Sequence, residues 1–148
     1  MYYETALQPQ VADTDFEGFI DYMSFSRWFD RARTTFYNEL FPKFQLKPHG
    51  LVVVKTSVEF FALVTVDDAV KVRTWVSRIG NKSFDITQEL WFERDGQSVI
   101  AARGHSIFST INFNYHKSEP LNERFLEVLR KFFWEGPDAI PQTNEFTL

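Results

Sequence analysis

The spacing of apolar residues changes near Gly50, from a helical repeat to an alternating one. Beyond Ser24, a suitable N-cap, apolar side chains recur at steps of three and four, which is the spacing of one buried face of an α-helix. Pro42 follows this run and marks its end. We therefore expect a helix over residues 24–40 with a wide aromatic face. Its apolar positions are Phe25, Trp28, Phe29, Ala32, Phe36, Tyr37 and Leu40.

Beyond Gly50 the apolar residues alternate with polar ones, and Val, Ile, Phe, Trp and Thr dominate, as in β-strands. The pairs Gly80-Asn81 and Asp95-Gly96 are hairpin turn signals between these runs. Short connections of this kind predict strands that run, in part, as an antiparallel meander. The predicted strands cover residues 51–61, 66–79, 83–92 and 99–112.

The ends of the chain carry weaker signals. Residues 3–11 predict a short strand that stops at an Asp-rich turn, and Pro120 is suited to open a second helix over 121–133. We expect a single domain over 1–134, followed by an irregular tail over 135–148. A long helix before an antiparallel sheet predicts the α+β class, with a curved sheet wrapped around one helix.

The strand predicted over 83–92 separates two kinds of side chain. Apolar residues at alternate positions share one face, and mostly polar residues share the other. We therefore expect one face to be buried and the other to be at least partly wet or at a subunit contact. The apolar face holds Phe84, Ile86, Leu90 and Phe92, and the other face holds Asp85, Thr87, Glu89 and Trp91.

Composition narrows the class of protein. The chain has 148 residues, 44% of them hydrophobic, which is enough for one domain with a substantial core. It has no cysteine, and its formal net charge of −4 argues against nucleic-acid and anionic-membrane partners. No long apolar run or secretory signal appears, so we expect a cytoplasmic protein. The histidines His49, His105 and His116 lack metal-ligand spacing, so we expect no metal site.

The segment before the helix carries the residues best suited to chemistry. Asp13, Asp15 and Gly18 lie just upstream of the helix, whose N-terminus presents unpaired N–H groups and partial positive charge. From the residues alone, Asp15 is either a base or nucleophile, or a carboxylate that only caps a turn. We expect Asp13 to hold the loop by hydrogen bonds. No Gly-x-Ser-x-Gly motif occurs, so hydrolytic chemistry would depend on the carboxylate.

A longer pattern runs through this segment and the helix. Its positions are occupied by Asp13, Asp15, Gly18, Phe19, Ile20, Tyr22, Ser24, Phe25, Trp28, Phe29, Asp30, Ala32 and Arg33. Further matches are Val58 to Ala62, Asp67-Asp68 and Lys82 to Phe84. With these residues the chain resembles hotdog-fold acyl-CoA thioesterases of the 4-hydroxybenzoyl-CoA thioesterase type, and the resemblance covers residues 3–121.

The resemblance implies a hotdog fold and a catalytic role for the loop. It implies that Asp15 attacks the thioester carbon or activates a water, that the backbone N–H of Tyr22 holds the oxyanion, and that Gly18 permits close approach of the loop. Many members carry His at the position of Tyr22, and others carry Tyr. No cofactor is implied, because coenzyme A is part of the substrate.

The same resemblance implies the substrate contacts. It implies that Lys82 lies near the phosphates of coenzyme A, although a lysine in a β-turn is commonly just solvated. Phe60 and Phe61 are candidates for the wall of an acyl site, or plain core residues. Asp21 stands where the family has a bulky aromatic residue. It is either a second acid near the substrate or a charge that favours the helix dipole.

Glu17 and Ser24 also depart from the family pattern, and they leave the acyl group open. Our leading hypothesis is an acyl-CoA thioesterase. The alternatives are a thioesterase acting on acyl carrier protein and a non-catalytic acyl-CoA binding module. The chain has 17 phenylalanines, more than one small domain can bury, so we expect a homodimer whose sheets join and whose active sites are shared, with a homotetramer as the next assembly.

Overall fold

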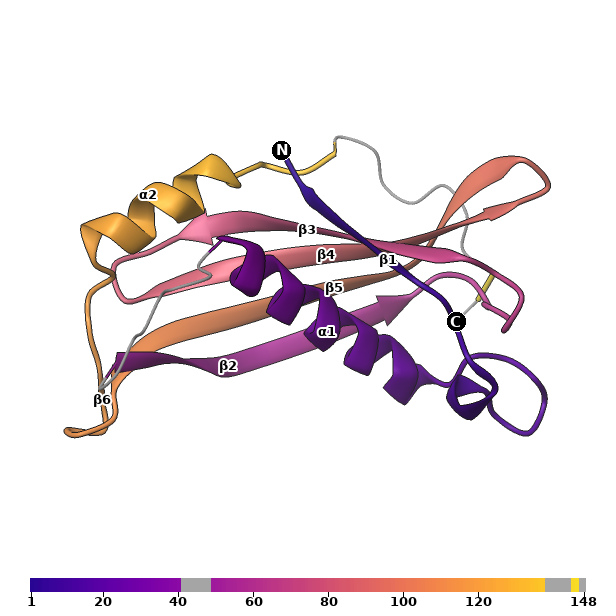
Figure 1. Cartoon of the computed structure of the whole chain (residues 1–148), viewed down its shortest axis with the longest axis horizontal. Coiled ribbons are helices and arrows are strands. Elements are labelled where there is room, and N and C mark those ends of the chain that lie inside the picture. The colour runs from indigo at the N-terminus through magenta and orange to yellow at the C-terminus, as the bar shows by residue number, and fades with distance from the viewer. Residues whose placement is uncertain (41–48, 138–144, 147–148) are drawn as a thin grey trace.

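A long helix, α1 (Tyr22–Leu40), lies against one face of a curved sheet (Figure 1). The computed structural model describes residues 1–40, 49–137 and 145–146. The α+β layout predicted from the sequence, a sheet curved around one helix, is confirmed. The other elements are β1 (Tyr3–Leu7), β2 (His49–Phe60), β3 (Val70–Ile79), β4 (Ser83–Arg94), β5 (Gln97–Asn112), β6 (Lys117–Ser118) and α2 (Glu123–Lys131).

In the described part of the chain, the sheet has the strand order β1-β3-β4-β5-β2, and β6 pairs with β5. All the strand pairs are antiparallel. The predicted meander is confirmed for β3, β4 and β5, which are joined by hairpins at the two predicted turns. In the second hairpin Asp95 and Gly96 both have positive φ, as a tight hairpin turn requires. Because β2 pairs with β5 and β1 with β3, these two strands form the edges of the main sheet.

Several predicted boundaries are wrong by a few residues. The first strand ends at Leu7, and residues 11–13 form a short 3-10 helix instead. The strand predicted from residue 66 begins at Val70. Helix α2 begins at Glu123 because Asn122 Oδ1 accepts the N–H of Phe125 at 2.8 Å and caps the helix, so Pro120 precedes the helix. The loop predicted after α1 and most of the predicted tail lie outside the described residues.

Two groups of apolar side chains fill the space between α1 and the sheet. The N-terminal half of α1 packs onto β3, β4 and β5 through Phe25, Trp28 and Phe29, and its C-terminal half packs through Phe36 onto residues from α2. A fully buried side chain of this kind stabilises the fold by about 1.5–3 kcal/mol. The predicted aromatic face of the helix is therefore the core. It fixes the position of the helix start, where the candidate site lies.

The outer face of the sheet, predicted to be partly wet or at a subunit contact, is mixed in the single chain. Thr87 and Trp91 on it are partly exposed, whereas Asp85 and Glu89 are only 8% and 1% exposed. Asp85 accepts from Arg78 Nε at 2.8 Å and contacts His105 Nε2 at 2.9 Å, and Glu89 accepts from Arg103 Nε at 3.0 Å. Cations on neighbouring strands therefore cover these carboxylates, which is why an alternating polar pattern does not mean solvent exposure here.

Candidate functional site

The segment between β1 and α1 folds back on itself at the N-terminal end of α1 (Figure 1). Thr14 and Ile20 form an isolated antiparallel bridge, and Asp15 N donates to Phe19 O at 2.7 Å. Ile20 is buried, and its N–H donates to Val64 O at 2.8 Å. Because side chains alternate along paired extended segments, Asp15 lies on the face opposite Ile20, away from the core. We refer to residues 13–21 as the catalytic-loop candidate.

Asp13 closes the base of this loop. Its Oδ2 accepts the N–H of Gln10 at 2.8 Å, and its carbonyl oxygen accepts the N–H of Asp21 at 2.9 Å. The hydroxyl of Ser24 donates to the same carbonyl at 3.3 Å. Asp13 therefore joins the loop to the first turn of α1, and its predicted structural role is confirmed.

Asp15 forms the turn at the tip of the loop. Its Oδ1 accepts two backbone N–H groups, from Glu17 at 2.9 Å and from Phe19 at 3.1 Å. The side chain is exposed, and among the described residues no donor lies within hydrogen-bonding distance of Oδ2. One carboxylate oxygen thus fixes the side chain while the other stays available. The capping role and the catalytic role, which the sequence left as alternatives, are compatible in this geometry.

Gly18 completes the same turn, and its N–H donates to Asp15 O at 3.1 Å. Its φ is +88°, a conformation that residues with a Cβ rarely adopt. A Cβ added here would meet no atom within 4 Å. Within the chain, glycine is therefore needed for backbone conformation, while the close approach implied by the resemblance stays a prediction.

The start of α1 lies next to the loop. Asp21 Oδ1 accepts the N–H of Ser24 at 2.7 Å, which makes Asp21 the N-cap and corrects the prediction that Ser24 would be the cap. The helix therefore begins two residues earlier, at Tyr22. Among the described residues, the N–H groups of Tyr22 and Met23 have no acceptor. These two groups point partial positive charge away from the helix, as an oxyanion donor must.

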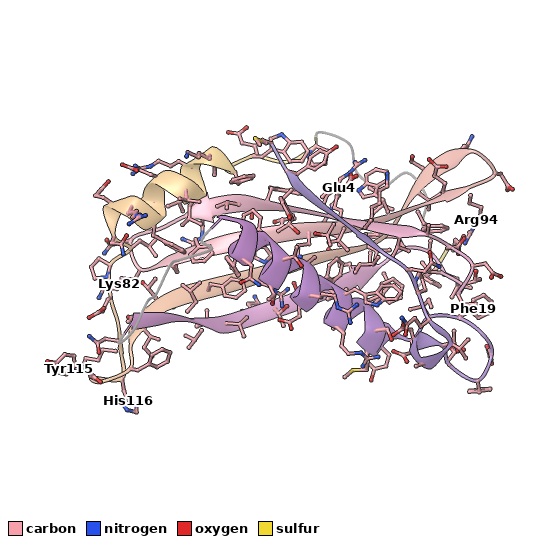
Figure 2. All side chains as sticks on the ribbon, in the orientation of Figure 1. Glu4, Phe19, Lys82, Arg94, Tyr115 and His116 are labelled. Carbon is pink, nitrogen blue, oxygen red and sulfur yellow. The ribbon has the colours of Figure 1, made fainter. Side chains whose placement is uncertain are left out.

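Of the remaining predicted site residues, Lys82 does not lie near Asp15 within one chain. Lys82 is exposed in the turn between β3 and β4, and Figure 2 places it at the opposite end of the molecule from Phe19. Phe60 packs edge-on against Phe25, with ring centroids 5.3 Å apart. Phe61 is half-buried just beyond β2. Substrate contact by Lys82, Phe60, Phe61 and Asp21 stays a prediction.

Phe16 stands out among the aromatic residues of the site. It lies between Asp15 and Glu17 and is 97% exposed. Tyr22 is also exposed, at 66%. One ring in the turn of the loop and one in the first turn of α1 are therefore exposed in the single chain.

Three hollows lie away from Asp15. One, of about 390 Å³, is lined by residues that include Arg73, Trp91 and Ser98 on the outer face of the sheet. Two others adjoin Gly136 near the end of α2. Asp15 lines none of these three, and its side chain is exposed in the single chain. Among the described residues, we found no group of three or more His, Asp or Glu side chains arranged to hold a metal ion, and no helix long and apolar enough to cross a bilayer.

Comparison with solved structures supports the fold assignment. The chain aligns with a predicted thioesterase from Bacillus stearothermophilus at 26% identity and a TM-score of 0.82, covering 93% of this chain and 100% of that one. A 1,4-dihydroxy-2-naphthoyl-CoA thioesterase from Synechocystis aligns at 19% identity and a TM-score of 0.76, covering 88% and 96% of the two chains.

A third structure, a mutant of 4-hydroxybenzoyl-CoA thioesterase complexed with 4-hydroxybenzoyl-CoA, aligns at 14% identity and a TM-score of 0.76, covering 86% and 98%. At such low identities the last two likenesses establish the shared fold. No match was found among curated proteins.

Family membership comes from the sequence model. Residues 24–99 match the model of the thioesterase superfamily. This span contains most of α1 and all of β2, β3 and β4, and the catalytic-loop candidate ends three residues before it begins. The hotdog architecture and this match agree, and the chain belongs to the thioesterase superfamily as a thioester hydrolase.

Proposed function

We propose that the chain hydrolyses acyl-CoA thioesters to a free acid and coenzyme A, with Asp15 as the acting carboxylate and the N–H of Tyr22 as the oxyanion donor. One observation carries the proposal. A carboxylate fixed through one oxygen lies in a loop folded against a helix start whose first two N–H groups have no protein acceptor. The names of the two CoA thioesterases of the same fold support coenzyme A as the carrier.

The chemistry needs little from the protein beyond these groups. In the base route, Asp15 takes a proton from a water, the hydroxide oxygen bonds to the thioester carbon, and the tetrahedral oxyanion accepts the N–H of Tyr22. The C–S bond then breaks, and the sulfur leaves with a proton as the free thiol. In the nucleophile route, Asp15 itself bonds to the carbon, the C–S bond breaks and the thiolate leaves. Water then splits the resulting anhydride into the free acid and the Asp15 carboxylate, and the remaining proton goes to the thiolate. Both routes give the same products.

The two N–H groups on Oδ1 prepare the carboxylate for either route. They hold the side chain in one orientation before substrate binds, so its conformational entropy is lost on folding and not in the reaction. They leave Oδ2 as the reacting oxygen. This assignment explains why the turn needs both a carboxylate at position 15 and a glycine at position 18.

We propose that a second copy of the chain completes the site. The outer edge of β2 has no partner strand among the described residues, and it runs for 12 residues. Val53 and Val54 on this strand are 53% and 59% exposed. A long, partly apolar edge of this kind is a template for pairing with another strand. Two β2 edges related by a two-fold axis would join the sheets, as predicted from the sequence.

Such a dimer would also give Lys82 a role. In Figure 1, β2 runs from the end that carries the 80–83 turn to the end that carries the catalytic-loop candidate. Antiparallel pairing of two β2 edges therefore brings Lys82 of the partner subunit to the end where Asp15 lies. From the β2 edge, the partner's β4 is two strands further on, about 10–15 Å at ordinary strand spacing. A long substrate such as an acyl-CoA can bridge that interval.

A thiol-release assay over short, long, branched and aromatic CoA esters, run beside the matching acyl carrier protein esters, tests the function. We expect release from at least one CoA ester. Release only from carrier-protein esters would favour that alternative, and tight CoA ester binding without release would favour a binding module. The acyl group is left to this assay, because selectivity for one methylene depends on the shape of the assembled pocket.

The dimer is tested separately by light scattering on a Val53→Glu/Val54→Glu double variant. Like charges facing each other across the paired edges should shift the mass from dimer or tetramer to monomer and lower turnover, while the circular dichroism spectrum is retained. A monomeric wild-type chain with full turnover would contradict the shared site.

A further inference from the structure

Glu145, three residues from the end of the chain, is bound to a turn that is distant in sequence. Its backbone N–H donates to Phe61 O at 2.7 Å, and its Oε2 accepts the N–H of Leu63 at 2.9 Å. Its Oε1 pairs with Arg94 Nη1 at the end of β4. The second guanidinium nitrogen of Arg94 donates to Leu63 O at 2.7 Å. Glu145 and Arg94 together therefore satisfy both backbone groups of Leu63.

This arrangement is more than a loose surface ion pair. The side chains of Arg94 and Glu145 are 39% and 28% exposed, so solvent screens them only in part. The guanidinium of Arg94 lies 4.8 Å from the centroid of the Phe92 ring, which packs in the core. That stacking fixes the guanidinium before it binds Glu145, and hydrogen bonds between charged partners are the stronger class.

The turn held by this pair supports the catalytic-loop candidate. Directly after Leu63, the carbonyl of Val64 accepts the N–H of Ile20 at 2.8 Å, and Thr65 forms an isolated bridge with Phe19. The N–H of Phe19 is one of the two donors to Asp15 Oδ1. A continuous series of short contacts thus runs from Glu145 to Asp15. Figure 2 places Arg94 at the same end of the molecule as Phe19.

We propose that Glu145 and Arg94 are positioning residues for the catalytic loop, and that this pair holds the 61–65 turn under that loop. Neither side chain is placed near the reacting atoms; they act through Leu63, Val64 and Ile20. The inference rests on the proposed function for its effect on turnover, and on the backbone contacts alone for its effect on loop geometry. Arg94 lies inside the span matched by the family model, and Glu145 lies outside it.

The test compares Glu145→Ala, Arg94→Ala and the double variant with Arg130→Ala, which breaks an exposed ion pair on α2 (3.8 Å to Glu123). Amide hydrogen exchange at Ile20 reports loop anchoring, and thiol release reports turnover. We expect Ile20 to exchange faster and kcat to fall about tenfold with KM nearly unchanged, because small misplacements of reacting groups are costly. Arg130→Ala should change neither quantity. Glu145→Gln retains an acceptor for Leu63 N–H, so it should keep much of the wild-type turnover and much of the slow exchange at Ile20.

The double variant adds a second criterion. Since both side chains act through the same turn, the double variant should lose only slightly more turnover than either single variant. Unchanged exchange at Ile20 in Glu145→Ala would overturn the inference, as would faster exchange with full turnover. If the wild-type chain releases thiol from no ester, the proposed function fails, and the exchange at Ile20 then decides the anchoring by itself.

Discussion

Gly18→Ala tests whether the candidate site depends on the backbone conformation at position 18, because the added Cβ strains that conformation without creating a clash. An alanine held at the φ of +88° found at Gly18 should lower the free energy of unfolding by about 1–2 kcal/mol. No clash adds to this loss, because a Cβ there would meet no atom within 4 Å. For a chain of 148 residues this loss corresponds to a fall in Tm of about 2–8 °C. If the turn relaxes to relieve the strain, the orientation of the Asp15 carboxylate changes with it.

Gly96 provides a matched control. Its φ is +77°, a Cβ there would also meet nothing within 4 Å, and it lies in the β4–β5 turn, outside the catalytic-loop candidate. Gly96→Ala should therefore lower Tm by a similar amount while thioester turnover is retained. Gly18→Ala should lower both, with turnover falling by about tenfold or more since the reacting oxygen moves.

Calorimetry and a thiol-release assay on the two variants, below the Tm of each, give the comparison. Equal turnover in Gly18→Ala and Gly96→Ala would refute the reasoning, because it would mean that the turn at Gly18 does not orient a reacting group. A Gly18→Asn variant should lie between glycine and alanine, since asparagine tolerates positive φ better than alanine does.

Three further predictions concern stability. Arg103→Met leaves the carboxylate of Glu89, which is 1% exposed, without its cation, and should lower the free energy of urea unfolding by about 3 kcal/mol. This value is at the low end for a buried pair because Arg103 is itself 28% exposed. Adding Glu89→Gln should restore most of the lost stability, and no recovery would contradict the pairing. Gln88→Leu removes the acceptor of Arg33 Nη1 (2.9 Å) between α1 and the sheet and should lower the free energy of unfolding by about 2 kcal/mol. An unchanged urea midpoint would contradict this and show that water replaces the amide. Burial raises the pKa of the Tyr37 phenol well above its ordinary value, and the charge of Arg33 opposes this only in part, so the phenol ionises first in the unfolded chain and the free energy of unfolding falls as the pH rises past about 10. Tyr37→Phe should remove the share of this alkaline loss that Tyr37 causes. Equal slopes of stability against pH in the two proteins would contradict this prediction.

Periodicity predicted the layers of the fold because burial decides them. The aromatic face of α1 and the alternation of β4 follow directly from which side chains must leave water, so Phe29 and Phe84 were placed in the core before the structure was known. The start of α1 was missed by two residues. Asp21 and Ser24 are both good N-caps, and only the backbone bond from Asp21 to Asp13 decides between them.

The sequence could not predict which side chains pair across neighbouring strands. Nothing in the local pattern says that Glu89 meets Arg103, because their contact depends on the register of β4 and β5. The support that Glu145 gives to the 61–65 turn is equally invisible, since the residues are some 80 positions apart. At the site, the motif located Asp15 and Gly18, but the exposure of Phe16 and the open surroundings of Asp15 came only from the coordinates.

Turnover by Asp15→Asn tests the central claim most directly. An asparagine keeps an oxygen that can accept the N–H groups of Glu17 and Phe19, so it preserves the turn while removing the charge and the reacting oxygen. We predict that this variant keeps the wild-type Tm and binds a CoA ester, yet releases thiol at least about 10²-fold more slowly. Wild-type release by Asp15→Asn, together with loss of release in Asp15→Ala, would mean that the carboxylate only caps the turn, and would contradict its catalytic role.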